Sequence, residues 1–351
     1  MPGGLVIRVV VVDDSAFMRK AIGSMLENDP DITVVGTARN GREGVELVRE
    51  LDPDVVTMDM EMPVMDGLAA LKRIMMEMPR PVIMISSLTV EGAEATLKAL
   101  DAGAVDYLPK KLSRVSLEII KIEAELRAKV KAVAKRVALR PVRQRSVAAF
   151  SRPVGTVPGR AVRTVVAIGV STGGPPAIQS ILASMPADFP SCILIAQHMP
   201  RAFTGPFAKR LDSLSPLKVS EAVDGDVLGP GRVYVAPGGS HLRVRRQGAR
   251  LEVEVSGEPA SALYKPSVNE LMDSVAGVIG PRALGVMLTG MGSDGLEGAR
   301  KLKLAGGRLL AQSDASCVVY GMPKAVIDAG LADEVVDLGD MAAQLQTEVG
   351  R

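Results

Sequence analysis

The sequence contains no tryptophan, two cysteines (Cys192 and Cys317) and two histidines (His198 and His241) in 351 residues. Two cysteines exclude a disulfide framework and a cysteine-based zinc cluster, and they fit a reducing, cytoplasmic location. Two histidines are too few for a multi-histidine metal site. Aromatic residues make up only 3% of the chain, which argues against a stacking surface for single-stranded nucleic acid.

Long hydrophobic runs and a strong net charge are also missing. No apolar run approaches the ~20 residues of a membrane-spanning helix. The apolar run at the start meets Asp13 and Asp14 at once, which predicts a first strand and not a signal peptide. The formal net charge is +2, so bulk charge does not indicate a polyanion binder. We expect a monomer that binds no nucleic acid and does not insert into a membrane.

Short apolar runs alternate with amphipathic stretches in two parts of the chain, and this predicts two α/β domains. In the first part the runs are apolar on both faces, as in a parallel sheet that is covered on two sides. They predict a doubly wound, five-stranded parallel domain in residues 1–125. The predicted strands are 7–12, 33–38, 55–59, 82–86 and 106–108.

A second alternating pattern begins near residue 164 and predicts another doubly wound, mostly parallel α/β domain in residues 161–351. Residues 219–255 look more like antiparallel strands, so we expect a small antiparallel insertion there. The predicted strands outside this insertion are 164–170, 192–196, 283–288 and 308–311, and a run at 232–236 falls within it.

Residues 126–160 separate the two domains and read as a helical extension that runs into a basic linker. No acidic residue occurs between Arg127 and Arg163, and residues 140–160 contain three prolines. The alternative is a patch for nucleic acid or anionic lipid. We favour the linker because aromatic residues are not interleaved with the basic ones.

Polar side chains stand at the ends of several strands of the first domain. Asp13 and Asp14 follow the first strand, Asp59 ends the third, Ser86 ends the fourth and Lys110 follows the fifth. In a parallel sheet these ends share one edge, where clustered carboxylates repel one another unless a cation lies among them. Oxygen ligands of this kind suit Mg²⁺ with a phosphoryl partner. For Asp14 alone, a helix N-cap is an equally good interpretation.

Residues 5–125 resemble the response-regulator receiver domain. The matching motifs are Val-Asp-Asp-Ser at 12–15, Met-Asp-Met-Glu-Met-Pro-Val-Met-Asp-Gly at 58–67, Ser86 and Lys110. The resemblance implies that Asp59 accepts a phosphoryl group from a sensor histidine kinase. It also implies a Mg²⁺ site at Asp13, Asp14, Asp59 and the Glu61 backbone carbonyl, phosphoryl contacts from Ser86 and Lys110, and a switch role for Tyr107. The family usually has proline after the lysine, where this chain has Lys111.

Ser171 lies in Gly-Val-Ser-Thr-Gly-Gly-Pro-Pro, between an apolar run and a predicted helix. One interpretation is a phosphate loop at a helix N-terminus, but the complete phosphate-loop and dinucleotide motifs are missing. The other is a nucleophilic serine on a strand-to-helix turn. A serine nucleophile needs a base and an orienting carboxylate. His198 and Asp294 each follow an apolar strand, and we prefer His198 over His241 because its strand is next along the chain.

Residues 164–340 look like the catalytic domain of the chemotaxis methylesterase family. The matching motifs surround Ser171, His198 and Asp294 and include Tyr-Val-Ala-Pro-Gly-Gly at 234–239. The resemblance implies Ser171 as nucleophile, His198 as base, Asp294 as its partner, and an oxyanion hole at the Thr172 and Met291 N–H groups. It implies a phosphorylation-activated hydrolase of glutamate methyl esters on chemoreceptors, with no cofactor for hydrolysis. The family also deamidates receptor glutamines.

Two other classes of function compete with this hypothesis. The first is a signalling adaptor whose catalytic remnant only binds a receptor. The second is a receiver-controlled nucleic-acid binder that uses the basic linker. The complete set of serine, histidine and aspartate argues against the first, and the near-zero net charge argues against the second.

Overall fold

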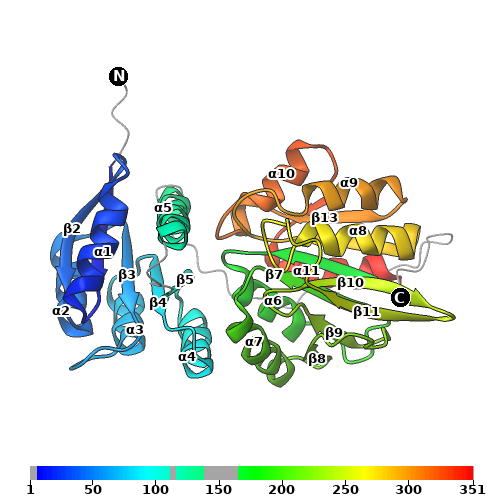
Figure 1. Cartoon of the computed structure of the whole chain (residues 1–351), viewed down its shortest axis with the longest axis horizontal. Coiled ribbons are helices and arrows are strands. Elements are labelled where there is room, and N and C mark those ends of the chain that lie inside the picture. The colour runs from blue at the N-terminus through cyan, green and yellow to red at the C-terminus, as the bar shows by residue number, and fades with distance from the viewer. Residues whose placement is uncertain (1–5, 111–115, 138–164, 351) are drawn as a thin grey trace. The chain divides into compact units, whose positions relative to one another are not determined.

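The computed structural model describes residues 6–110, 116–137 and 165–350. The chain divides into two compact units, residues 1–142 and 143–351 (Figure 1). The predicted basic linker at 140–160 and the position of Lys111 lie outside the described residues. The described residues contain no helix of the length and apolarity that a membrane crossing requires.

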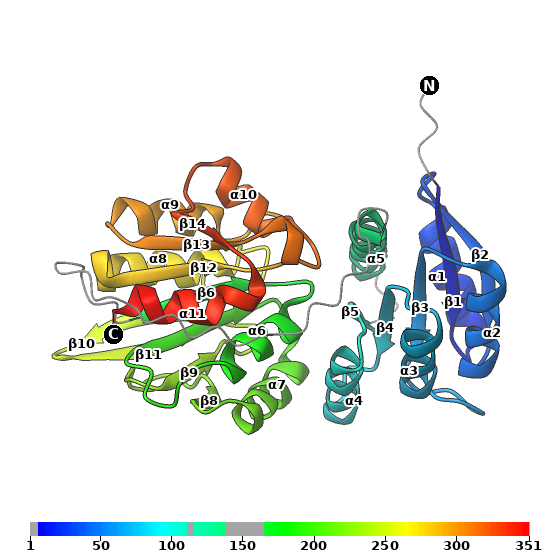
Figure 2. The ribbon, with the colours of Figure 1, turned by 180° about the vertical axis from the view of Figure 1, so that it is seen from behind.

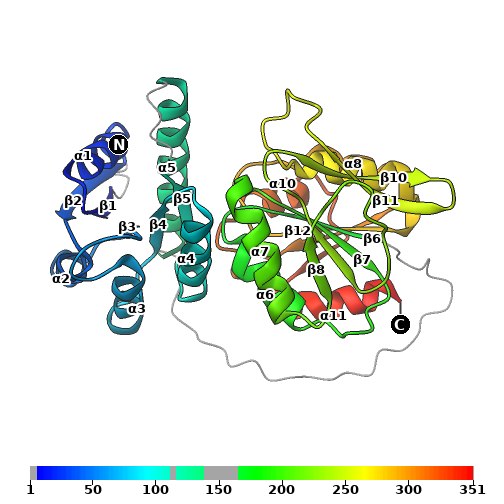
Figure 3. The same ribbon diagram turned by 60° about the horizontal axis from the view of Figure 1, so that its bottom comes forward.

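The first unit is a parallel sheet of five strands in the order β2-β1-β3-β4-β5. Helices α1 and α5 cover one face, and α2, α3 and α4 cover the other (Figure 3). This confirms the predicted doubly wound architecture. The elements are β1 (Ile7–Val12), α1 (Ala16–Glu27), β2 (Ile32–Ala38), α2 (Gly41–Leu51), β3 (Val55–Asp59), α3 (Gly67–Glu77), β4 (Val82–Ser86), α4 (Val90–Asp101), β5 (Asp106–Pro109) and α5 (Ser116–Val137).

Local sequence explains where these elements begin. The central strands β3 and β4 are buried along their whole length, so their side chains are apolar on both faces. Several helices begin at a residue whose side chain accepts a backbone N–H from the first turn. Asn40 caps α2 through the N–H of Glu43, and Asp66 caps α3 through the N–H of Ala69. These two caps follow β2 and β3, so both helices start at the carboxyl edge of the sheet.

The second unit is a parallel sheet of seven strands in the order β14-β13-β12-β6-β7-β9-β8, accompanied by the antiparallel pair β10–β11. Its elements are β6 (Val165–Val170), α6 (Gly174–Ala183), β7 (Cys192–Gln197), α7 (Arg201–Leu214), β8 (Lys218–Glu221), β9 (Arg232–Val235), β10 (His241–Gln247), β11 (Arg250–Ser256), α8 (Val268–Ile279), the 3-10 turn Gly280–Arg282, β12 (Ala283–Met287), α9 (Leu296–Leu304), β13 (Arg308–Gln312), the 3-10 turn Asp314–Ser316, α10 (Met322–Asp328), β14 (Glu334–Val336) and α11 (Leu338–Val349).

Helices cover both faces of this sheet as well. Helices α8, α9 and α10 pack with the β10–β11 hairpin in one core on the first face. Helices α6, α7 and α11 cover the second face, where α6 packs against both α7 and α11 (Figure 2). Strand β6 lies between β12 and β7. The loops that follow these three neighbouring strands therefore meet at one edge of the sheet.

The antiparallel insertion is smaller than the sequence pattern predicted. Strands β8 and β9 pair in parallel and extend the main sheet beside β7. Among the described strands of this unit, the antiparallel pair is β10 and β11, in register from His241 opposite Ser256 to Gln247 opposite Arg250, and an isolated antiparallel bridge joins Val227 to Glu252. An alternating pattern indicates that a strand has one buried face, but it does not indicate whether the strand pairs in parallel or antiparallel. The prediction of antiparallel strands over residues 219–255 is therefore confirmed for β10 and β11 and wrong in strand direction for β8 and β9.

Candidate active site

Ser171 stands on the turn between β6 and α6. Its backbone N–H donates to the Thr289 carbonyl at 3.0 Å, which ties the turn to the loop after β12. Gly173 has φ +77°, a left-handed conformation that favours glycine. A Cβ on Gly290 would lie 2.8 Å from the Ser171 Cβ. Close backbone approach by glycines therefore fixes the position of the Ser171 side chain.

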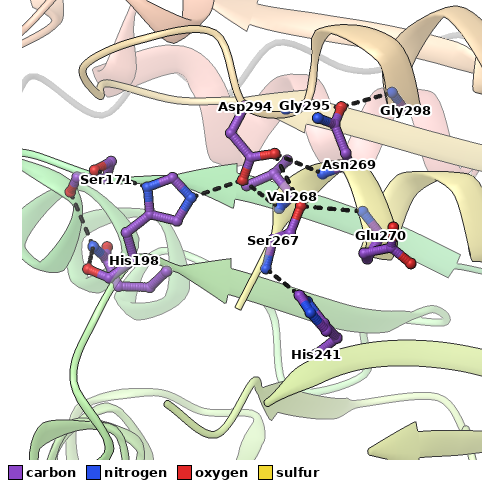
Figure 4. Close-up of polar contacts among 11 residues, drawn as sticks. Ser171, His198, His241, Ser267, Val268, Asn269, Glu270, Asp294, Gly295 and Gly298 are labelled. Atoms are coloured by element: carbon purple, nitrogen blue, oxygen red, sulfur yellow. Dashed lines mark hydrogen bonds and ion pairs between the residues drawn. The ribbon is translucent and has the colours of Figure 1, made fainter. Parts of the chain in front are cut away.

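The structure brings Ser171, His198 and Asp294 into one hydrogen-bonded chain (Figure 4). The Ser171 Oγ lies 3.2 Å from the His198 Nδ1, and the His198 Nε2 lies 2.8 Å from the Asp294 Oδ2. The three residues follow β6, β7 and β12, the neighbouring strands named above. The side chains of His198 and Asp294 are 11% and 4% exposed, so most of this chain is shielded from water.

Asp294 is held in its ionised form at the start of α8. Its carboxylate accepts the N–H groups of Val268 and Asn269 at 2.7 and 3.1 Å, and the Ser267 hydroxyl at 3.0 Å. Burial by itself raises the pKa of Asp294, but the His198 hydrogen bond and these N–H groups outweigh it and hold the pKa below its usual range. The N-terminal end of a helix dipole also favours a negative charge.

The ionised Asp294 determines which imidazole nitrogen carries the proton. A carboxylate can only accept, so the His198 Nε2 is the donor of the 2.8 Å contact. In the neutral ring the Nδ1 is then an acceptor. It faces the Ser171 hydroxyl, which donates to it. This arrangement can take the serine proton as the serine oxygen attacks an electrophile.

The N–H groups of Thr172 and Met291 belong to two peptides that are held at their carbonyls. The Ser171 carbonyl accepts the Gly174 N–H at 2.9 Å and the Gln197 Nε2 at 3.0 Å. The Gly290 carbonyl accepts the N–H groups of residues 321 and 322 at 3.0 and 2.9 Å. Because a trans peptide is planar, fixing each carbonyl also fixes the direction of the N–H on its other side. Neither N–H donates a backbone hydrogen bond in the described part of the chain.

His241, the alternative base, occupies a different place. It is fully buried at the start of β10, and its Nδ1 accepts the Ser267 N–H at 3.2 Å. Burial lowers the pKa of His241 and so favours the neutral ring. In the described part of the chain, no hydrogen bond joins His241 to Ser171.

In the first unit, Asp13, Asp14 and Asp59 gather at the carboxyl edge of the sheet. Each offers one carboxylate oxygen, and these atoms lie within 4.8 Å of one another. The Lys110 Nζ lies 2.7 Å from the Asp59 Oδ2 and 3.3 Å from the Asp13 Oδ2. Oxygen ligands at this spacing suit a small, hard cation such as Mg²⁺.

The charges in this acidic cluster do not balance. Burial and the Asp13 charge raise the pKa of Asp59 even though Lys110 is in contact with it. Burial opposes the Lys110 charge, but two carboxylates raise the pKa of Lys110. One ammonium group therefore faces two buried carboxylates and balances only part of their negative charge. A bound cation would supply the missing positive charge.

Ser86 ends β4, the neighbour of the strand that ends at Asp59, and Tyr107 lies on β5 beyond it, but their side chains have other partners. The Ser86 and Thr96 hydroxyls are 2.6 Å apart, and both lie within hydrogen-bond distance of the Gly92 carbonyl. Tyr107 is buried, and burial raises its pKa well above the usual value. The Lys129 ammonium lies 5.6 Å from the centre of the Tyr107 ring.

Sequence reasoning missed several residues that hold the Ser171–His198–Asp294 site together. Ser267 caps α8 and bonds Asp294, and the spacing of Ser267 and Glu270 is a capping-box signal that would have located the helix start. Gln197 bonds the carbonyls of Ser171 and His198. Tyr264 stacks on the His198 ring. For Gln197 and Tyr264 the sequence offers no comparable signal.

Comparisons with known proteins identify the families that match the two units. The CheB methylesterase family matches residues 166–345, and the response regulator receiver domain matches residues 9–120. Protein-glutamate methylesterase/protein-glutamine glutaminase 1 of Oleidesulfovibrio alaskensis is 61% identical over 98% of this chain and 99% of its own length. Its counterpart 2 of Nitratidesulfovibrio vulgaris is 62% identical over 97% and 98%.

A solved structure supports the same assignment for the second unit. The crystal structure of the Thermotoga maritima CheB methylesterase catalytic domain matches with a TM-score of 0.51 and 40% identity, and covers 53% of this chain and 98% of that one. Both the sequence matches and this structural match therefore assign the chain, with its N-terminal receiver domain, to the CheB methylesterase family.

Proposed function

We propose that this protein hydrolyses glutamate methyl esters on chemoreceptors, with Ser171 as nucleophile, and that phosphorylation of its receiver domain activates it. The observation that carries the proposal is the chain of contacts from Ser171 through His198 to Asp294, at 3.2 and 2.8 Å. The family relationship supplies the substrate class, because the relatives are protein-glutamate methylesterases.

The reaction begins with transfer of the Ser171 proton to the His198 Nδ1 as the serine oxygen bonds to the ester carbonyl carbon. The carbonyl oxygen becomes an oxyanion, which the N–H groups of Thr172 and Met291 stabilise. Asp294 stabilises the imidazolium that forms. The His198 proton then passes to the methoxy oxygen, the ester C–O bond breaks, and methanol leaves an acyl-serine.

A water molecule completes the cycle. His198 takes a proton from the water as the water oxygen attacks the acyl carbon. The proton then passes to the Ser171 Oγ when the bond between this oxygen and the acyl carbon breaks. The product is a free glutamate carboxylate. The same sequence on a glutamine side chain would release ammonia in place of methanol. The glutaminase name of the relatives favours this second activity.

The receiver supplies the regulation in this proposal. Asp59 accepts a phosphoryl group from a sensor histidine kinase. Asp13, Asp14, Asp59 and the Glu61 carbonyl would hold a Mg²⁺ ion, whose charge would offset that of the phosphoryl group. Lys110 neutralises the phosphoryl oxygens. Ser86 contacts them after leaving its present partners on α4, and Tyr107 responds as the switch residue.

The proposed domain boundaries follow the same division. We assign residues 1–125 to the receiver, 126–160 to the helical extension and linker, and 161–351 to the catalytic domain of a monomeric enzyme. Hydrolysis itself uses no cofactor in this scheme. The Ser–His–Asp contacts also favour an enzyme over an adaptor that only binds a receptor.

The test is mass spectrometry of methylated chemoreceptor incubated with the full-length chain, with and without acetyl phosphate and Mg²⁺. We expect glutamyl methyl esters to become glutamates, and the rate to rise when acetyl phosphate is present. An Asp59→Asn chain should keep the basal rate and lose the response. Unchanged methyl esters with the full-length chain under both conditions would refute the proposed reaction.

A further inference from the structure

Tyr264 makes an aromatic contact with the base of the site. Its ring stacks on the His198 imidazole with the ring centres 4.2 Å apart and the planes 9° from parallel. We propose that Tyr264 is a positioning residue, an inference that rests on the proposed function. Its ring holds the His198 imidazole in the plane that allows contact with both Ser171 and Asp294. It also stabilises the imidazolium that forms during the reaction.

Rotation of the His198 imidazole about its Cβ–Cγ bond carries both ring nitrogens out of line with their partners. The two hydrogen bonds act at Nδ1 and Nε2, and hydrogen bonds weaken steeply as alignment is lost. A parallel ring against one face of the imidazole blocks rotation towards that face. The Tyr264 ring lies in this place.

The backbone next to Tyr264 is anchored on both sides of the following proline. The Lys265 carbonyl accepts the Gly239 N–H at 3.1 Å, and the Ser267 N–H donates to the His241 Nδ1 at 3.2 Å. Gly239 and His241 belong to the Pro-Gly-Gly-Ser-His segment at 237–241. The proposal therefore gives this segment a function, which is to hold the chain that presents Tyr264 to His198.

The far end of the Tyr264 side chain reaches the loop that carries Met291. A Cβ on Gly292 would lie 3.6 Å from the Tyr264 hydroxyl oxygen. Tyr264 therefore extends from the imidazole towards the loop with the proposed oxyanion donor. A side chain in this place restricts the base and stands beside the loop that receives the developing negative charge.

Charge also favours the stacked arrangement during catalysis. When His198 takes the serine proton, its ring becomes a cation against the face of an aromatic ring. The aromatic face carries the negative part of the ring quadrupole and attracts a cation. This attraction is stronger after proton transfer than before it. It therefore stabilises the transition state more than the ground state and lowers the barrier.

A rival role for Tyr264 is contact with the substrate. Tyr264 lines a cleft of 440 Å³ beside the site, together with Asn269, Glu270 and Asp294. A residue that only binds substrate changes KM and leaves kcat unchanged, whereas a residue that acts through the base changes kcat. The two roles are therefore distinguishable by kinetics and by the state of His198.

The experiment compares the full-length chain with its Tyr264→Phe and Tyr264→Leu variants. Tyr264→Phe keeps the aromatic face, and Tyr264→Leu removes it. Leu263→Ala is the control for the cleft, because Leu263 is the adjacent residue, is 84% exposed and lines the same cleft as Tyr264 without an aromatic ring to stack on His198. Methanol release from methylated chemoreceptor gives kcat and KM. Proton NMR follows the low-field His198 Nε2–H signal, which a His198→Ala chain assigns.

We expect Tyr264→Leu to lower kcat about three- to thirtyfold, the rate equivalent of one lost cation–π contact. KM should change little, and the Nε2–H signal should broaden or disappear through exchange with water. Tyr264→Phe should match the parent in kcat and in the Nε2–H signal, and so should Leu263→Ala. Both Tyr264 replacements remove the hydroxyl group, so a difference between them is due to the aromatic ring.

Three results would overturn the inference: a Tyr264→Leu chain with the parent's kcat, a rise in KM alone, or an Nε2–H signal that stays sharp without the aromatic ring. A Tyr264→Phe chain as impaired as Tyr264→Leu would also overturn it, by assigning the effect to the hydroxyl group. The NMR measurement needs no substrate. If the parent released no methanol, the proposed function would fail while the signal still decided the role of Tyr264.

Discussion

The carboxylate of Asp294 joins two parts of the catalytic domain, because its Oδ2 lies 2.8 Å from the His198 Nε2 and 2.7 Å from the Val268 N–H at the start of α8. One oxygen thus contacts both the imidazole and the first turn of a helix. The proposed triad is therefore part of the folded framework of the domain and not a set of groups on independent loops.

Replacing Asp294 with asparagine should damage both activity and stability. The amide can present an N–H to the His198 Nε2, which favours the wrong tautomer, so we expect kcat to fall about 10³- to 10⁴-fold. The lost charge-assisted bonds at the start of α8 should cost about 1–3 kcal/mol of unfolding free energy. Steady-state kinetics and chemical denaturation measure the two effects. Asp273→Asn, also on α8, is the control and should change neither strongly. An Asp294→Asn chain with more than a tenth of the parent's rate would contradict this role.

The stability that Asp294 contributes should depend on pH in a defined direction. Its pKa in the folded protein lies below the ordinary value of 3.8. Between the two values the unfolded chain binds more protons, so the contribution is complete above the unfolded pKa and is lost as pH falls through the folded one. The stability difference between parent and Asp294→Asn should therefore be constant near neutral pH and shrink below about pH 4. A difference that stays constant down to pH 2 would exclude this linkage.

A Gly290→Ala substitution should displace the nucleophile without altering its chemistry. The added Cβ would lie 2.4 Å from the Met322 Sδ and 2.8 Å from the Ser171 Cβ, so one of these groups must move. A misplacement of about 1 Å costs about 10²-fold in rate. Gly277→Ala is the matched control, because a Cβ there meets no atom within 4 Å. It should keep full activity and stabilise α8 by about 0.5–1 kcal/mol. Equal activity for the two variants would show that the Ser171 turn tolerates the extra carbon.

In the receiver, Asp59→Asn should stabilise the protein without Mg²⁺ and weaken Mg²⁺ binding. The raised pKa of Asp59 means that the ionised carboxyl is unfavourable in the folded state, so its contribution to stability is lost as pH rises through the folded pKa. The variant should therefore gain stability at pH 7 and lose that gain below about pH 4. With Mg²⁺ at ten times its dissociation constant the parent should gain about 1.4 kcal/mol. Thermal melts with and without Mg²⁺ test this, and a Mg²⁺ response that Asp59→Asn leaves intact would exclude Asp59 as a ligand.

Lys129 and Lys131 both lie on α5, and we expect their replacement to lower the stability of the receiver by very different amounts. Lys129 is buried and bonds Asp106 at 2.7 Å and the Tyr107 carbonyl at 2.8 Å, whereas Lys131 pairs with Asp29 and Asp31 at the surface. Lys129→Met leaves the buried Asp106 carboxylate without its cation and should cost about 3–5 kcal/mol in the unfolding of the receiver. Lys131→Met should cost less than about 1 kcal/mol. Similar losses for both would mean that the buried pair contributes no more than a surface one.

Much of the architecture was predictable because the patterns that encode it are local. The buried strands β1, β3 and β4 begin and end where their apolar runs do, and the residues at strand ends follow from the parallel order. Contacts between distant segments were not predictable. Nothing local places Tyr264 against His198, or Ser267 beside Asp294, since these pairs are brought together only by packing of α8 on the sheet. The parallel pairing of β8 with β9 was missed for another reason, because the side-chain pattern of a strand is the same in either direction.

The rate of methanol release from methylated chemoreceptor by three full-length chains tests the central claim most directly: the parent, Ser171→Ala and Ser293→Ala. Ser293 is an exposed serine next to Asp294 and serves as the control. The account predicts release by the parent, a similar rate for Ser293→Ala, and a loss of about 10³-fold or more for Ser171→Ala, because removing the nucleophile leaves only the oxyanion hole and binding. A Ser171→Ala chain that releases methanol at the parent's rate would contradict it.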